Sequence, residues 1–126
     1  MPQPALRVLF VDDDEGIRRF VPQALGRAGY EVVTASDGLD ALRVVDAELR
    51  FDLFILDIMM PRMRGDELAA RLHQRDPDTK VLYITGYADQ FLALRPRLRE
   101  NEEVLVKPVS VAALLEAVSR RIQQSA

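Results

Sequence analysis

Short runs of apolar residues alternate along the chain with longer stretches in which apolar residues recur every three or four positions. The short runs cover residues 6–11, 31–35, 53–56, 81–84 and 104–106. Runs of this length with few polar interruptions indicate strands that are buried on both faces. The stretches between them have the spacing of amphipathic helices, so the pattern predicts strand and helix in alternation.

The first helical stretch gives the clearest signals for its two ends. Its apolar positions follow the helical spacing over residues 17–28, and Gly29 predicts the C-terminal end. Asp14 and Glu15 are suited to the N-terminus, where acidic side chains are stabilising. Pro22 removes one backbone donor inside the helix at a cost of about 3 kcal/mol, so we expect a kink there and not a break.

Four more helices are expected in the remaining stretches. They cover residues 39–49 after Asp37-Gly38, a stretch that includes Leu68, Arg71 and Leu72, residues 88–100 interrupted by Pro96, and residues 111–122 with Ser110 as N-cap. Five strands that alternate with five helices predict an α/β fold, a doubly wound parallel sheet covered on both faces. We expect a single domain over residues 1–126, with no output domain in this chain.

Composition and charge exclude several functional classes. The 126 residues include no cysteine and one histidine, which excludes disulfides, thiolate chemistry and poly-histidine metal sites. A net charge of −3 offers no basic field for nucleic acid, and no apolar stretch is long enough for a membrane span. No signal peptide or P-loop motif is present either. We therefore expect a cytoplasmic protein that binds neither nucleic acid nor membranes directly.

Polar residues with chemical potential stand where the predicted strands end. They are Asp12, Asp13 and Asp14 after the first strand, Asp57 after the third, Thr85 after the fourth and Lys107 after the fifth. Ligands bind at the carboxyl ends of the strands in open α/β sheets, and a flavodoxin-like strand order would bring these side chains together. Carboxylates that share one crevice repel each other, so either their pKa values rise or a cation neutralises them. Mg²⁺, or Mn²⁺, is the natural occupant for oxygen ligands of this kind.

Asp57 has the neighbours that a carboxylate nucleophile in phosphoryl transfer needs, and a carboxylate can form an acyl phosphate. The cation and Lys107 would stabilise the charge on the phosphoryl oxygens, and Thr85 would donate a hydrogen bond to them. Gly86 has no side chain and leaves room for these oxygens. Pro108 restricts Lys107 to an extended conformation, and a cis bond between the two costs only about 0.5–1 kcal/mol.

Taken in order, these motifs resemble the receiver domains of bacterial two-component response regulators over nearly the whole chain. The motifs are Asp12-Asp13 followed by Arg18, Leu56-Asp57-Ile58-Met59-Met60-Pro61 completed by Gly65, Thr85, and Lys107-Pro108. The resemblance implies a flavodoxin-like fold with strand order 2-1-3-4-5 and Asp57 as the phospho-acceptor. It also implies that Asp13, Asp57 and the backbone carbonyl of Met59 ligate the metal, with Asp12 acting mainly through a metal-bound water.

The resemblance also implies partners. The phosphoryl donor would be a phosphohistidine on a sensor histidine kinase or a histidine phosphotransfer protein. His73 is not this donor, because it falls on the third helix away from the strand ends, and we expect it to face solvent. The output would pass to a downstream protein, or through a homodimer formed by the fourth helix, fifth strand and fifth helix. The domain would then catalyse only its own phosphoryl transfer and slow self-dephosphorylation.

Several positions depart from the family pattern. Val104 stands where the family often has an aromatic switch residue, Val109 where a Phe often follows the lysine-proline pair, and Pro96 interrupts the fourth helix. These departures leave open an alternative, a receiver-like interaction module that acts without phosphorylation. Met59 and Tyr87 flank the site without a carboxylate or amide to orient water, which predicts slow self-dephosphorylation. Met59 also disfavours an aspartyl-phosphate phosphatase, which needs a second carboxylate at that position.

Overall fold

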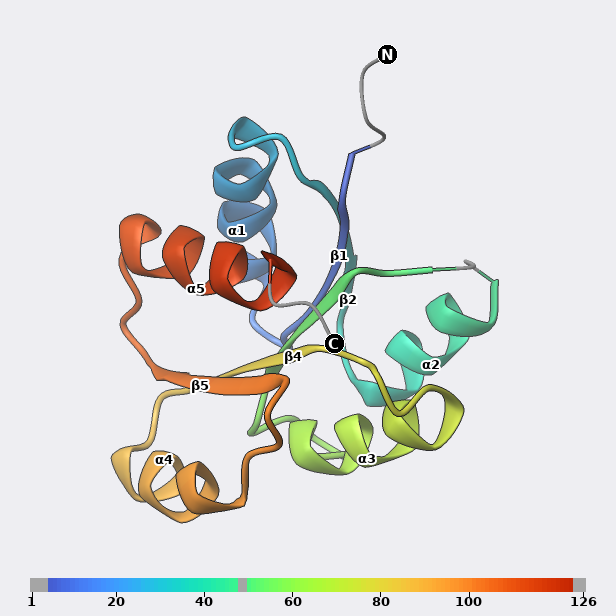
Figure 1. Ribbon diagram of the computed structural model, residues 1–126, viewed down its shortest axis with the longest axis vertical. Coiled ribbons are helices and arrows are strands. Elements are labelled where there is room, and N and C mark those ends of the chain that lie inside the picture. Colours follow the sequence, from blue (N-terminus) through green and yellow to red (C-terminus); the bar gives the residue numbers. More distant parts are fainter. Residues whose placement is uncertain (1–4, 48–49, 124–126) are drawn as a thin grey trace.

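The structure, a computed structural model that describes residues 5–47 and 50–123, contains one five-stranded parallel sheet (Figure 1). The strands are β1 (Arg7–Val11), β2 (Glu31–Ala35), β3 (Leu53–Asp57), β4 (Val81–Thr85) and β5 (Glu102–Val106). Their order is β2-β1-β3-β4-β5, and every neighbouring pair is parallel. Both the flavodoxin-like order and the parallel pairing confirm the sequence predictions.

Helices cover both faces of the sheet. They are α1 (Glu15–Arg27), α2 (Gly38–Ala47), α3 (Gly65–Arg75), α4 (Ala88–Leu94) and α5 (Val111–Gln123). Helices α1 and α5 lie on one face and α2, α3 and α4 on the other, and each layer encloses its own cluster of buried apolar residues (Figure 1). None of the helices in the described part of the chain is both long and apolar enough to cross a membrane.

The ends of the helices follow the predicted signals. The Asp14 carboxylate accepts a hydrogen bond from the Ile17 amide at 3.1 Å and caps α1. The Ser110 hydroxyl accepts one from the Ala113 amide at 3.0 Å and caps α5. Gly29, after α1, has a φ of 97°, which a residue with a side chain rarely adopts. Of the second predicted helix, residues 48 and 49 lie outside the described residues.

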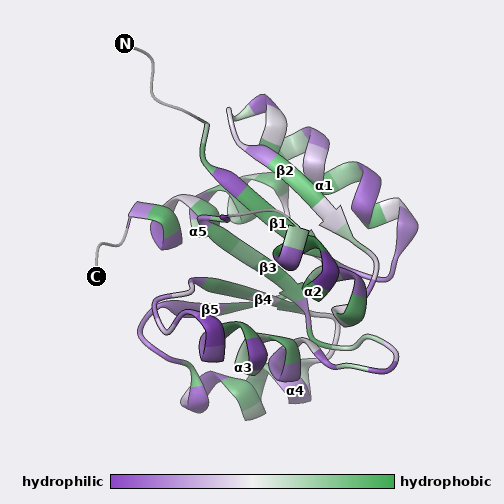
Figure 2. Cartoon of the chain, turned by 90° about the vertical axis from the view of Figure 1, so that its right-hand side faces the viewer, coloured by the Kyte–Doolittle hydropathy of each residue, from purple (hydrophilic) through white to green (hydrophobic). Residues whose placement is uncertain are grey.

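The central strands are the most deeply buried part of the chain. Every residue of β3 and β4 is buried, and the edge strand β2 is largely half-buried. The central strands are accordingly mostly apolar, and hydrophilic residues gather on the helices and loops (Figure 2). Because packed interiors deform little, the carboxyl ends of β1, β3 and β4 give a rigid platform for the residues that follow them.

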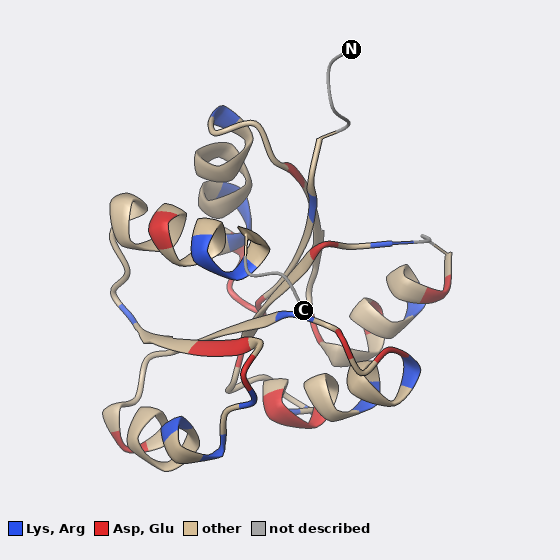
Figure 3. Cartoon of the chain, in the orientation of Figure 1, with Lys and Arg blue, Asp and Glu red and all other residues tan. Residues whose placement is uncertain are grey.

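The predicted start of β5 and the predicted end of α4 differ from the structure by two residues or more. Strand β5 begins at Glu102, two residues early, because partners satisfy its charged residues: Arg120 Nη2 on α5 lies 2.6 Å from Glu103 Oε2. Acidic positions open β5, and basic positions lie on α5 (Figure 3). Helix α4 ends at Leu94 and continues only as a 3₁₀ turn over Arg95–Arg97. Pro96 lies inside that turn and lacks the amide hydrogen that an α-helix would need.

The prediction that His73 faces solvent is wrong. His73 is 6% exposed, and its Nε2 lies 3.1 Å from the Thr79 carbonyl oxygen and 3.6 Å from Glu102 Oε2. The Tyr83 hydroxyl donates to the same carboxylate at 3.2 Å. Burial raises the pKa of Tyr83, and the charge of Glu102 raises it further. A polar cluster thus joins the end of α3 to β4 and β5, at the opposite end of the sheet from Asp57.

Candidate functional site

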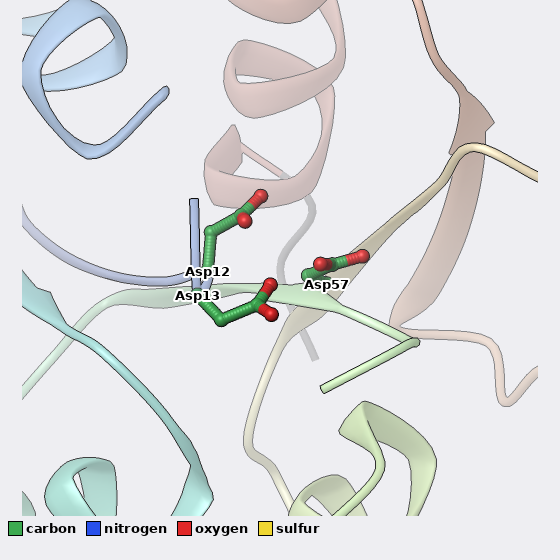
Figure 4. A group of neighbouring side chains, drawn as sticks. All are labelled: Asp12, Asp13 and Asp57. Carbon is green, nitrogen blue, oxygen red and sulfur yellow. The ribbon is translucent and has the colours of Figure 1, made fainter. Parts of the chain in front are cut away.

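Three aspartates converge at the carboxyl ends of β1 and β3. Asp12 and Asp13 directly follow β1, and Asp57 is the last residue of β3. One carboxylate oxygen of each lies within 4.8 Å of those of the other two, and the three side chains lie side by side (Figure 4). Asp12 and Asp57 are buried and Asp13 is exposed, so the acidic cluster reaches the surface on one side.

Hydrogen bonds to its surroundings hold Asp12 in place. Its Oδ1 accepts from the Asp14 amide at 2.9 Å, which ties the carboxylate to the start of α1. Its backbone carbonyl accepts from Arg18 Nη1 at 2.8 Å, which explains an arginine at this position of the motif. The turn between β1 and α1 therefore fixes the direction of the Asp12 carboxylate before any ligand binds.

Lys107 brings a positive charge to the cluster from the end of β5. Its Nζ lies 3.0 Å from Asp12 Oδ2 and 3.8 Å from Asp57 Oδ2. Its backbone amide donates to the Thr85 carbonyl at 2.7 Å, which aligns the ends of β4 and β5. The Lys107-Pro108 bond is cis, the form that the sequence made plausible. One ammonium group cannot neutralise three carboxylates, so the site retains a net negative charge.

The pKa of Asp57 reflects this excess of negative charge. Burial, and the charges of Asp12 and Asp13, raise the pKa of Asp57 to about 7 against the opposing charge of Lys107 and a hydrogen bond from the Met59 backbone. Burial disfavours the ammonium form of Lys107, but its hydrogen bond to Asp12 and the nearby carboxylates raise its pKa. A partly buried cluster of carboxylate oxygens with excess negative charge matches the ligands that a hard divalent cation prefers.

Thr85, the last residue of β4, is fully buried and points toward α4. Its Oγ1 lies 2.7 Å from Gln90 Oε1 and accepts a hydrogen bond from the Tyr87 amide at 3.2 Å. The sequence reading did not single out Gln90, because no motif marks it. A Cβ added to Gly86 would meet nothing within 4 Å, so neighbouring atoms do not demand a glycine there. Room for phosphoryl oxygens beside Gly86 stays a prediction.

Gly65, the last residue of the predicted acceptor motif, lies against the backbone of Asp57. A Cβ at this position would lie 2.2 Å from the Asp57 carbonyl oxygen, closer than any real contact. The Gly65 amide also donates to the Ile58 carbonyl at 2.9 Å. The glycine therefore lets α3 start directly beside the acceptor strand.

Met59 and Tyr87 lie where the sequence placed them, one on each loop that follows a site strand. Their side chains are 43% and 56% exposed, and the Met59 sulfur lies 3.6 Å from Arg64 Nη1. The Met59 carbonyl as a metal ligand stays a prediction. Met60 and Met63, in contrast, are buried in the core.

The neighbour of Val104 across the sheet explains why a small side chain stands at this position. Val104 of β5 pairs with Tyr83 of β4, and both belong to the buried cluster on the α4 side. Tyr83 is 3% exposed, and its ring is held by the hydrogen bond to Glu102. An aromatic ring thus already occupies the space next to position 104, and it comes from β4.

Comparison with known proteins identifies the family. Residues 8–119 match the response regulator receiver domain model. The response regulator receiver protein CpdR of Brucella abortus is 36% identical over 116 residues, which are 92% of this chain and 96% of CpdR. The sensor kinase CckA of the same organism is 31% identical over 119 residues, which cover 93% of this chain and 12% of CckA. The chain also matches several transcriptional regulatory proteins, and it spans 25–51% of their length.

The solved structures agree with this match. The response regulator TrrA of Thermotoga maritima, crystallised in complex with Mg²⁺-BeF, superposes with a TM-score of 0.82 and 33% identity. The alignment covers 92% of this chain and 98% of TrrA. Sequence family, strand order and the arrangement of Asp12, Asp13, Asp57, Thr85 and Lys107 at one edge of the sheet lead to the same assignment. The chain belongs to the response regulator receiver domain family.

Proposed function

We propose that this receiver domain is a phosphorylation-controlled switch in which Asp57 accepts a phosphoryl group from a phosphohistidine. One observation carries the proposal: the buried Asp57 carboxylate lies close both to the carboxylates of Asp12 and Asp13 and to the ammonium group of Lys107. This arrangement is unfavourable for a carboxylate alone, because burial and like charges raise its pKa to about 7. It becomes favourable when a cation and an anionic group arrive together.

The donor atoms fit Mg²⁺ or Mn²⁺. Asp13 and Asp57, with the Met59 carbonyl, would hold the ion, and Asp12 would act through a metal-bound water. Three carboxylates within 4.8 Å of one another supply hard oxygen ligands and the negative charge that a divalent ion balances. The ion would supply positive charge beside the phosphoryl oxygens. The Mg²⁺-BeF complex of TrrA, a relative with the same fold, supports this assignment.

Each residue of the site then has its own role in phosphoryl transfer. An Asp57 carboxylate oxygen bonds to phosphorus while the phosphorus–nitrogen bond of the phosphohistidine breaks, and the imidazole, protonated from solvent on its other ring nitrogen, departs as the neutral base. Lys107 Nζ, now 3.8 Å from Asp57, attracts the phosphoryl oxygens, and Thr85 donates its hydroxyl hydrogen to one of them. Asp12 holds the ammonium group at 3.0 Å, so its position is set before the reaction.

The partners follow from this chemistry. The donor would be a sensor histidine kinase or a histidine phosphotransfer protein in the cytoplasm, and the similarity to a segment of sensor kinase CckA supports a place in such a pathway. The phosphorylated domain would bind a downstream protein or pair with a second copy through α4, β5 and α5. It would catalyse no reaction beyond its own phosphoryl transfer and slow self-dephosphorylation.

Incubation with a small phosphodonor and Mg²⁺, followed by intact-mass measurement, tests the proposal. Wild type should gain one phosphoryl group, and Asp57→Asn should gain none. Asp78→Asn is a matched control, because Asp78 is an exposed residue in the turn before β4. An adduct that persists in Asp57→Asn would refute Asp57 as acceptor. A wild type that stays unmodified, while an established receiver is labelled, would favour the phosphate-independent interaction module.

A further inference from the structure

We propose that Gln90 is a positioning residue for Thr85 and couples phosphorylation of Asp57 to helix α4. This inference rests on the proposed function, because it describes how the loaded site is reported to the rest of the domain. The juxtaposition that carries it is the 2.7 Å contact between Thr85 Oγ1 and Gln90 Oε1.

The hydroxyl group of Thr85 has one hydrogen to donate. Its oxygen already accepts from the Tyr87 amide at 3.2 Å, and the Gln90 oxygen can only accept, so the hydrogen points to α4. A phosphoryl oxygen on Asp57 also needs that hydrogen. Since one hydroxyl cannot serve two acceptors fully, phosphorylation and the Thr85–Gln90 bond exclude each other.

Helix α4 is held weakly enough for this loss to matter. Of the five α-helices in the described part of the chain, α4 alone has no buried residue. It has seven residues, and no side chain caps its N-terminus. Among the described residues, the Thr85–Gln90 contact is the only side-chain hydrogen bond that joins α4 to a strand. Its apolar attachment relies on Phe91 and Leu94, which are only partly buried.

The released side chain has a place to go. Gln90 lines a cavity of about 220 Å³ between the start of α3 and α4, together with Ile58 and Leu94. Charged side chains, among them Asp66 and Arg97, line the same cavity, so it can accept the polar end of Gln90. Two arrangements of Gln90 are therefore available, one bonded to Thr85 and one turned into the cavity.

The Thr85–Gln90 contact also agrees with the absence of an aromatic switch residue at position 104 of β5. Val104 is too small to follow a movement of Thr85, and the neighbouring ring of Tyr83 is buried and tied to Glu102. Neither side chain can act as a rotating aromatic switch. Gln90 makes direct contact with Thr85 and so replaces that relay with a single hydrogen bond to α4.

Beryllofluoride with Mg²⁺, the phosphoryl mimic bound by TrrA, allows a test on the intact chain. Two quantities are measured: the affinity of the chain for beryllofluoride, and the hydrogen exchange of the α4 backbone amides with and without beryllofluoride. Gln90→Leu removes the acceptor, and Gln90→Ala repeats the test with a smaller side chain. Leu92→Ala is the matched control, because Leu92 lies on the same helix and is 67% exposed. Gln90→Glu keeps an acceptor oxygen and should retain wild-type exchange in the free protein.

In wild type and Leu92→Ala, beryllofluoride should speed exchange in α4. In Gln90→Leu and Gln90→Ala, α4 exchange should already be fast in the free protein and should change little when beryllofluoride binds. The affinity for beryllofluoride should rise about twofold to tenfold over wild type, which corresponds to the net free energy of one hydrogen bond. Equal affinity and equal α4 exchange in Gln90→Leu and Leu92→Ala would overturn the role of Gln90 alone. A wild type that binds no beryllofluoride would overturn the proposed function and the coupling with it.

Discussion

Replacing Asp57 by Asn should stabilise the metal-free protein at neutral pH. The pKa of Asp57 rises from 3.8 to about 7 through burial and the charges of Asp12 and Asp13. Between these two values the folded protein holds a proton that the unfolded chain has released, so stability falls as pH rises through this window. At about 1.36 kcal/mol per pKa unit the full shift is worth about 4 kcal/mol. The Asn amide oxygen accepts a weaker hydrogen bond from the Met59 backbone than a carboxylate does, which offsets part of this and leaves an expected gain of about 1–3 kcal/mol.

Urea denaturation of wild type and Asp57→Asn in EDTA measures this gain. The difference in unfolding free energy should be small near pH 4, grow as the pH rises, and level off above about pH 7. The control Asp78→Asn should show no such growth. Excess Mg²⁺ binds the folded wild type and should reduce the difference. A variant less stable than wild type at neutral pH, or a difference that does not change with pH, would refute the reasoning.

Three further changes test other parts of the site and fold. Gly65→Ala should lower the unfolding free energy by about 1–3 kcal/mol in urea, because its Cβ would lie 2.2 Å from the Asp57 carbonyl oxygen; an unchanged midpoint would contradict this. Tyr83→Phe should cost about 1–3 kcal/mol in the same assay, since it removes a donor from a buried carboxylate; wild-type stability would show that the hydroxyl is dispensable. The Met59→Asn, Tyr87→Glu double variant should lose its phosphoryl group faster than wild type by intact mass, and equal rates would argue against slow self-dephosphorylation.

The residues proposed to bind the metal and the phosphoryl group could be predicted because their position follows from topology alone. Asp12, Asp57, Thr85 and Lys107 each end or follow an apolar run, and parallel strands place all such ends at one edge. Residue type then supplies the chemistry, since carboxylates, a hydroxyl and an ammonium group suit few ligands other than a cation and an anion together. No detail of side-chain packing was needed for this step.

The polar cluster at the other end could not be predicted in this way. His73 and Glu102 interrupt apolar patterns, and a hydropathy reading assigns such residues to the surface. Both side chains are buried because nearby polar groups satisfy them. The Glu102 carboxylate accepts from the Tyr83 hydroxyl and from the Arg99 amide at 2.9 Å, and His73 Nε2 lies 3.1 Å from the Thr79 carbonyl oxygen. Such pairing depends on distances across three elements, which a linear pattern does not contain. The late start predicted for β5 has the same cause.

Gln90 was missed for a related reason, and its position shows what kind of signal this domain can transmit. One hydrogen bond is worth about 1 kcal/mol, which shifts a two-state equilibrium about fivefold. A helix with several buried residues would hardly respond to a change of this size, because each fully buried apolar side chain contributes about 1.5–3 kcal/mol. Helix α4 has no buried residue and can respond. The small Val104 and the weakly attached α4 are therefore consistent with one mechanism. Because no aromatic ring at position 104 can rotate, the signal has to act on an element that one hydrogen bond can hold or release.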